Sequence, residues 1–114
     1  MNAYEIPNLR FSMPAGGNVA RNRFVTVNAD GNGVQATTTS NIIGASMNQT
    51  KSGEVLEIAN GIVMVEAAET VASGAVVSAD ADGKAITGTV GTTIIAGIAI
   101  TAGTAGGFMA VKIN

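Results

Sequence analysis

Apolar and polar residues alternate along residues 9–13, where Leu9, Phe11 and Met13 enclose Arg10 and Ser12. A period of two is typical of a strand with one buried face. Further short apolar runs follow, separated by Gly, Asp, Asn and Thr. They lie at residues 24–27, 42–47, 53–58, 61–65, 76–79, 94–100 and 106–111. Residues 65–72 are the only window rich in helix formers, and we expect a loop or one short turn there. The pattern predicts an all-β or mainly β protein.

The stretch 19–31, VARNRFVTVNADG, returns at 71–83 as VASGAVVSADADG. At an offset of 52, six of the thirteen positions are identical. Each copy is an apolar strand that runs into an Ala-Asp-Gly turn, which is a strong hairpin signal because Gly accepts a positive φ. Asn22 corresponds to Gly74, and both residue types readily take a left-handed backbone conformation.

The other runs are related in the same way. Residues 9–13 correspond to 61–65 at an offset of 52, and at an offset of 53 Gly44 corresponds to Gly97 and 53–58 to 106–111. A glycine inside a strand marks a bulge, a bend or a close backbone approach, and its recurrence favours a bend needed twice. Two units are too few for a solenoid. We therefore expect two half-domains of about four short strands, near 8–59 and 60–113, that close on each other as one small β-barrel or sandwich over 8–114. Residues 1–7 would form an N-terminal arm.

Composition narrows the class of protein. With 114 residues, 46% apolar and 12% charged, the chain suits one folded domain and not a disordered one. Its six Lys and Arg residues cluster only at Arg21 and Arg23, so we expect no nucleic-acid partner. Residues 94–100 are too few to span a bilayer, and residues 1–10 lack a signal-peptide pattern. We expect neither a membrane partner nor secretion.

The sequence also lacks the usual catalytic and metal-binding residues. There is no His and no Cys, which removes the common general base, the thiol nucleophile and the soft metal ligands. The turns at 28–33 and 80–84 resemble the start of a calcium loop. The twelfth positions are Thr39 and Gly91 and not an acidic residue, so a hairpin turn is favoured over a metal site. The adjacent Lys51 and Ser52 are better interpreted as solvated. We expect no enzyme, no cofactor and no metal.

A resemblance to a known family rests on the second half of the chain. Residues 61–87 (GIVMVEAAETVASGAVVSADADGKAIT), the 94–100 strand with Gly97, and the terminal FMAVKIN resemble the small phage capsid decoration, or cement, proteins. The resemblance implies a β-barrel or β-tulip-like domain on the outer surface of the virion, made in the host cytoplasm. It further implies a structural protein that binds the major capsid protein and stabilises the head, as a homo-oligomer with a trimer favoured.

The candidate capsid-binding element is the N-terminal arm. Tyr4 and Ile6 flank Glu5 ahead of Pro7, which suits an arm that adds as a strand to a partner. The strand that follows would supply further anchors. The first hairpin would supply a second, basic binding surface, because its Arg21 and Arg23 are replaced by Ser73 and Ala75 in the second copy. The predicted partner-binding residues are Tyr4, Ile6, Leu9, Arg10, Phe11, Arg21 and Arg23.

An alternative function is a carbohydrate- or surface-binding β-module on the virion, such as an adhesive head or tail appendage. Sugar sites usually present exposed aromatic faces. With one Tyr, three Phe and no Trp, the chain has little material for such a site. The composition therefore favours the capsid-binding function.

Overall fold

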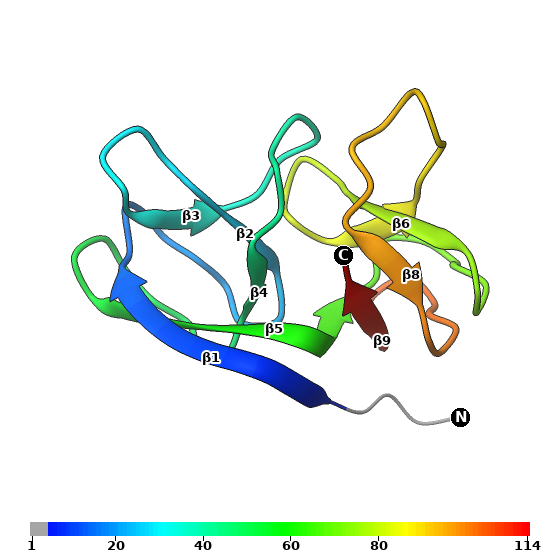
Figure 1. The fold of residues 1–114 in the computed structure, drawn as a ribbon, viewed down its shortest axis with the longest axis horizontal. Helices are drawn as coiled ribbons and strands as arrows, with labels where there is room; N and C mark the ends of the chain where they lie inside the picture. The colour runs from blue at the N-terminus through cyan, green and yellow to red at the C-terminus, as the bar shows by residue number, and fades with distance from the viewer. Residues whose placement is uncertain (1–4) are drawn as a thin grey trace.

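Nine strands form one antiparallel sheet in the computed structural model, which describes residues 5–114 (Figure 1). The strands are β1 (Ile6–Pro14), β2 (Phe24–Val27), β3 (Gly33–Gln35), β4 (Gly44–Ser46), β5 (Val55–Glu66), β6 (Val76–Ala79), β7 (Ala85–Thr87), β8 (Gly97–Ala99) and β9 (Phe108–Ile113). Their order is β3-β2-β4-β5-β9-β8-β6-β7, and β1 pairs with β5. Residues 5–114 contain no helix, and the predicted all-β class is confirmed.

Strand β5 belongs to both halves, which the sequence analysis did not predict. Separate strands were expected at 53–58 and 61–65, but the structure has one strand of twelve residues. Its burial pattern explains the difference. Leu56 and Ile58 are buried on one face and Val63 and Val65 on the other, with the phase changing at the adjacent buried pair Ile58 and Ala59. One strand thus gives its first face to one core and its second face to another.

Each half closes into a small barrel of five strands. In the first half the order is β1-β5-β4-β2-β3, and a parallel bridge between Ala15 and Gly33 joins the chain after β1 to β3. The second half has β5, β9, β8, β6 and β7, with the bridge between Ala67 and Ala85. A single bridge thus joins the two ends of the sheet within each half, and the halves also bury apolar residues against each other in one shared cluster.

The pairing of the first half recurs in the second at the offsets seen in the sequence. Phe24 pairs with Ala45 on β4, and Val76 pairs with Ile98 on β8. Isolated bridges join Val19 to Thr50 and, correspondingly, Val71 to Gly103. The duplicated sequence pattern therefore encodes duplicated strand pairing.

Both predicted hairpins are present, and the first residue of each turn stabilises it. The Asn28 Oδ1 accepts hydrogen bonds from the N–H groups two and four residues later, at 3.0 and 3.0 Å. The Asp80 Oδ1 accepts the corresponding pair at 2.8 and 2.9 Å. Gly31 and Gly83 take φ values of 81° and 75°. The side-chain oxygen of Asp80, considered above as a calcium ligand, is used inside its own turn.

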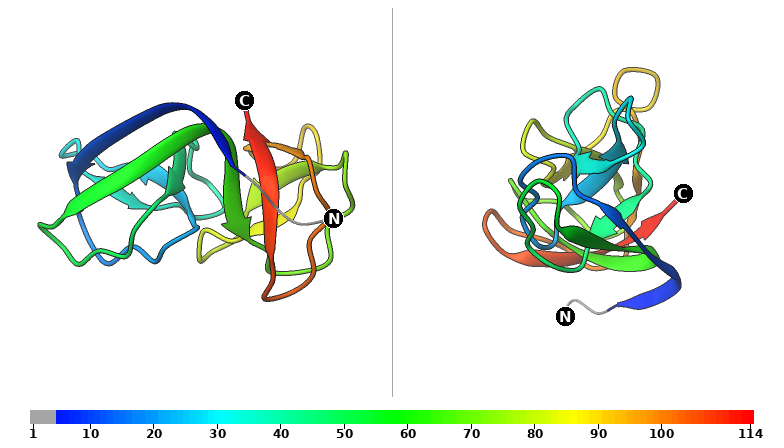
Figure 2. Two further views of the ribbon diagram at one scale, coloured as in Figure 1. Left: turned by 90° about the horizontal axis from the view of Figure 1, so that it is seen from below. Right: turned by 90° about the vertical axis from the view of Figure 1, so that its left-hand side faces the viewer.

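The two halves are joined by backbone hydrogen bonds and by a shared core. The Phe24 N–H donates to the Gly83 carbonyl at 2.8 Å, and the Glu66 N–H donates to the Asn22 carbonyl at 2.9 Å. The larger hydrophobic cluster contains Phe24 from the first half together with residues of the second. Figure 2 shows the halves side by side, with β5 running from one into the other. The chain therefore folds as one unit.

Candidate functional site

β1 and the first part of β5 form a two-stranded exposed surface with an open edge. The Ala15 N–H donates to the Glu54 carbonyl at 2.8 Å, which sets the phase of the antiparallel ladder. The backbone groups of odd-numbered β1 residues then face β5, while those of Arg10 and Ser12 face outward. Pro14, which has no N–H to lose, occupies the same edge. Within residues 5–114, β1 pairs with β5 only, and the bridge between Ala15 and Gly33 meets this edge just beyond Pro14, so the part of the edge at Arg10 and Ser12 can accept an added strand.

The outer face of these strands carries a mixed set of side chains, which we call the β1 surface. It consists of Arg10, Ser12 and Pro14 on β1 with Val55 and Glu57 on β5, where Ser12 is opposite Glu57 and Pro14 is opposite Val55. Val55 is 64% exposed. A shallow cavity of about 140 Å³ lies beside Arg10 and Glu57. The β1 surface thus offers apolar, basic and acidic groups within one small exposed area.

The predicted anchor residues fall in different environments. Tyr4 lies outside the described residues. Ile6, the sixth residue of the predicted arm, already belongs to β1 and pairs with β5. Phe11 is turned inward and packs against the core of the first half. Arg10 is exposed on the β1 surface, and Leu9, on the other face of the strand, is 57% exposed. Leu9 and Arg10 are therefore accessible to a partner.

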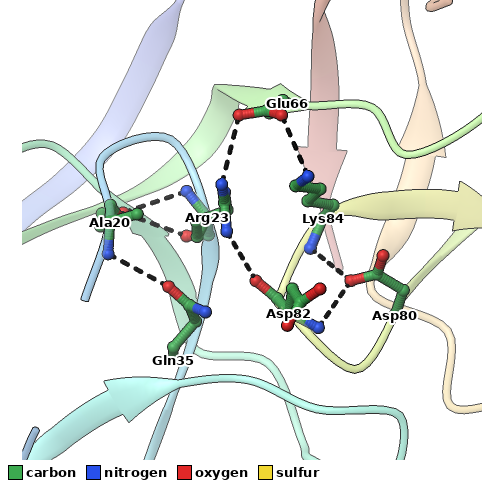
Figure 3. A network of polar contacts seen from close by, with 8 residues as sticks. Ala20, Arg23, Gln35, Glu66, Asp80, Asp82 and Lys84 are labelled. Atoms are coloured by element: carbon green, nitrogen blue, oxygen red, sulfur yellow. Dashed lines mark hydrogen bonds and ion pairs between the residues drawn. The ribbon is translucent and has the colours of Figure 1, made fainter. Parts of the chain in front are cut away.

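The two arginines of the first hairpin have different surroundings. Arg21 is exposed. The side chain of Arg23 is 16% exposed, and its Nη1 donates to the Asp82 carbonyl at 3.0 Å while its Nη2 pairs with Glu66 at 3.3 Å (Figure 3). Lys84 pairs with the same Glu66 carboxylate at 3.3 Å. Arg23 thus holds the second half against the first, and only Arg21 is freely presented to solvent.

A larger cavity, of about 270 Å³, lies in the first half where the loops before β2 and β5 meet β3. Its lining residues are Asn18, Val19, Ala20, Arg23, Gln35, Gln49, Thr50 and Lys51. Only Arg23 among them was a predicted partner-binding residue, because the lining comes from three separate segments of the chain. One signal was present in the sequence: at the repeat offsets, Gln35 corresponds to Thr87 and Thr50 corresponds to Gly103.

The described part of the chain offers no metal-binding cluster of three or more His, Cys, Asp or Glu residues. Nor does any helix in residues 5–114 have the length and apolar character needed to cross a membrane. The exposed β1 surface and its edge, together with the larger cavity, are the features that can act on another molecule.

Comparison with known proteins identifies the family of the chain. The sequence profile of the phage cement proteins matches residues 5–113. The chain belongs to the phage cement protein family.

This cement protein has the same fold as a solved structure described as the head fiber gp8.5 N base in bacteriophage phi29, with a TM-score of 0.75. The two chains are 17% identical, and the match covers 93% of each. Comparison with curated proteins finds no match. Family membership makes the chain a capsid-associated structural protein of the virion.

Proposed function

We propose that this cement protein binds the outer surface of a phage capsid and stabilises the lattice of the major capsid protein. The observation that carries the proposal is the family match, which spans residues 5–113 of a chain of 114. A capsid presents many identical sites, so a modest contact repeated over the lattice can reinforce the whole shell. The same family resemblance leads us to expect a homotrimer with the major capsid protein as its partner.

The capsid contact is proposed to lie along β1. The outward N–H and C=O groups of Arg10 and Ser12 can pair with an extended segment of the capsid protein. The side chains of Arg10 and Glu57 on the β1 surface can meet charges of either sign, and exposed Leu9 supplies an apolar contact. Tyr4 and Ile6 remain predicted anchors, and Arg21 is a second candidate.

Binding to undecorated heads tests the proposal. Purified protein is added to heads that lack it, and occupancy is measured by cosedimentation and by cryo-electron microscopy. We expect density at symmetry axes on the outer surface, and release of packaged DNA at a higher temperature than from undecorated heads. Heads that stay bare under conditions that preserve the shell would contradict the proposal.

A proline variant tests the β1 edge itself. Ser12→Pro removes an N–H that faces away from β5, so it blocks strand addition while leaving the β1–β5 hydrogen bonds in place. We expect head affinity to fall by about tenfold or more, which corresponds to ~1.4 kcal/mol or more. Ser12→Ala keeps the N–H and serves as the matched control with near-normal affinity. If the proline variant folds normally and binds heads as the wild type does, the contact lies elsewhere.

A further inference from the structure

We propose that one sheet face of the second half binds the first half of a second copy of this chain. The face consists of Val76 on β6, Ile98 on β8 and Lys112 on β9, which are neighbours because Val76 pairs with Ile98 and Ile98 pairs with Lys112. We call it the open face. The inference rests on the internal repeat, does not require the proposed capsid contact, and gives the expected homotrimer a contact surface.

The open face corresponds to a face of the first half that is covered. At the repeat offsets its residues match Phe24, Ala45 and Ala59, which pair across β2, β4 and β5 in the same way. These three residues are 0%, 1% and 1% exposed, and they belong to the hydrophobic cluster that contains the second half. In contrast, Ile98 is 44% exposed and Lys112 is also exposed. The same sheet face is therefore buried in the first half and open in the second.

A backbone hydrogen bond from the β6–β7 turn closes the covered face. The Phe24 N–H donates to the Gly83 carbonyl, while the Phe24 carbonyl accepts from the Ala36 N–H, both at 2.8 Å. On the open face the Val76 carbonyl accepts from the Gly88 N–H at 2.8 Å, so Val76 lies in the same register as Phe24. Among residues 5–114, no loop carbonyl accepts a hydrogen bond from the Val76 N–H. The open face thus has a donor where the covered face has a completed bond.

The β2–β3 turn of a second copy has the structure that this donor requires. It repeats the β6–β7 turn, with Gly31 at the position of Gly83 and φ values of 81° and 75°. Gly31 is exposed, nothing lies within 4 Å of a Cβ there, and none of the described residues donates a backbone hydrogen bond to its carbonyl. The Gly31 carbonyl can therefore accept from Val76 of another copy, as the Gly83 carbonyl accepts from Phe24.

The ion pair of the internal junction is replaced on both sides at once. Within the chain, Arg23 pairs with Glu66 at 3.3 Å (Figure 3). The corresponding residues are Ala75 beside the open face and Pro14 before the β2–β3 turn. Replacing one partner alone would leave an unpaired charge in the contact, whereas two apolar residues remain compatible. Pro14 has no N–H, so the bond from the Glu66 N–H to the Asn22 carbonyl has no counterpart. The contact between copies should therefore be weaker than the internal one.

The chain ends fix the order of the copies. β5 passes from the first half to the second at residues 60 and 61, which correspond to Ile113 and Leu9. The end of β9 in one copy therefore meets the start of β1 in the next, and Asn114 and the residues before Leu9 must turn aside. The pairing of β1 with β5 shifts register between Pro7 and Leu9, so the preceding residues are set off from the regular ladder. The N-terminal arm is thus outside this contact.

This arrangement joins the second half of one copy to the first half of the next. Such a heterologous contact leaves one surface of each kind free in a dimer, and it continues until the rotation closes a ring. A closed trimer would leave neither surface exposed.

Sedimentation of the full-length protein without heads tests the open face. We expect association that increases between about 10 µM and about 1 mM. Ile98→Glu places a charge in the contact and should weaken association at least tenfold. Val90→Glu is the matched control, because Val90 is 75% exposed and its counterpart Thr38 stays exposed beside the internal junction. A protein that is monomeric throughout, or equal association of Ile98→Glu and wild type, would overturn the proposal.

Cross-linking tests the head-to-tail order. The chain has no Cys, so single cysteines can be placed at will. The Arg23 Nη1 donates to the Asp82 carbonyl at 3.0 Å across the internal junction, and the counterparts are Ala75 and Asp30. Ala75→Cys and Asp30→Cys are prepared separately and treated with a short bismaleimide. We expect cross-linked dimers when the two variants are mixed and not from either alone. Efficient cross-linking within one variant, or none in the mixture, would overturn the proposal.

A variant of the arm separates this contact from an exchange of N-termini. The double substitution Tyr4→Ala and Ile6→Ala removes the predicted arm anchors and should leave association as in the wild type. Loss of association in this variant would show that the arm is the contact, which would overturn the proposal. Because these measurements contain no heads, a failure of the proposed capsid contact would leave their outcome unchanged.

Discussion

Two glycines at corresponding positions set the closest backbone contacts of the sheet. A Cβ on Gly44 of β4 would meet the Ala59 carbonyl oxygen, and a Cβ on Gly97 of β8 would overlap the Lys112 carbonyl oxygen. In both cases the obstacle is backbone of the neighbouring strand, which cannot rotate away. The sequence analysis favoured a bend at these two positions, and the structure shows that what recurs at both is a close backbone approach.

Gly97→Ala is expected to lower the free energy of unfolding by about 3 kcal/mol, at the upper end of what overpacking usually costs. The added methyl group must push β8 away from β9. Gly17→Ala is the matched control, because nothing lies within 4 Å of a Cβ there. Its change should stay within about 0.5 kcal/mol. Urea denaturation followed by circular dichroism measures both, and equal midpoints would contradict the prediction.

At the scale of elements, the β6–β7 turn docks onto the start of β2. Arg23 contributes a solvent-exposed side-chain hydrogen bond to the Asp82 carbonyl and a partly buried ion pair with Glu66. The corresponding turn of the first half, at Gly31, meets nothing within 4 Å of a Cβ, whereas Gly83 packs against Gln35 and the Phe24 carbonyl. The two hairpins have the same local structure, but only the second joins the halves.

Arg23→Ala, which installs the residue found at the corresponding position 75, should lower the free energy of unfolding by about 2 kcal/mol through the loss of charged hydrogen bonds. Glu66 keeps Lys84 as a partner, which limits the loss. Arg21→Ala provides the control two residues away, where an exposed side chain should contribute within about 0.5 kcal/mol. Thermal or urea unfolding of the two variants gives the comparison. A larger effect at Arg21 would show that the junction is held differently.

The whole molecule is two barrels that share one strand and part of one core. β5 gives Leu56 and Ile58 to the first core and Val63 and Val65 to the second. Phe24 of the first half lies in the same cluster as the residues of the second. A cut between the halves would divide β5 and expose this cluster to water. The repeats are therefore expected to unfold together in one transition.

Fragments 1–59 and 60–114, expressed separately, should each lack stable structure, because each loses part of β5 and neither retains the complete core. Far-UV circular dichroism and amide proton dispersion measure this directly. The control is the full-length protein with a protease site inserted beside Val90, which is 75% exposed in a loop. This protein is folded first and then cleaved once at that site. That nicked protein should keep the native spectrum. A well-dispersed spectrum from either fragment would show that a half can fold alone.

Part of the candidate site could be predicted from the sequence. The alternation of Leu9, Phe11 and Met13 with Arg10 predicted the strand and the exposure of Arg10. The neighbours of Arg10 on β5, Glu57 and Val55, could not be predicted, because first and last strands of a half meet only after the chain has closed. The larger cavity of the first half had a signal in the difference between Thr50 and Gly103, but burial of Thr50 was visible only in the structure.

Local residues were sufficient for the strand class and the two Asp-Gly hairpins, because these depend on backbone preferences and on neighbours a few positions apart. The recurrence of Gly44 and Gly97 was visible in the sequence, but the backbone of the neighbouring strand that requires glycine there was not. Tertiary contacts decided that β5 is one strand. The stretch Ala59-Asn60-Gly61 has the local character of a break, yet burying opposite faces of β5 in two cores stabilises it as continuous strand. They also decided that Arg23 is an internal residue and Arg21 a surface one, since only the docked second half supplies the Asp82 carbonyl and the Glu66 carboxylate.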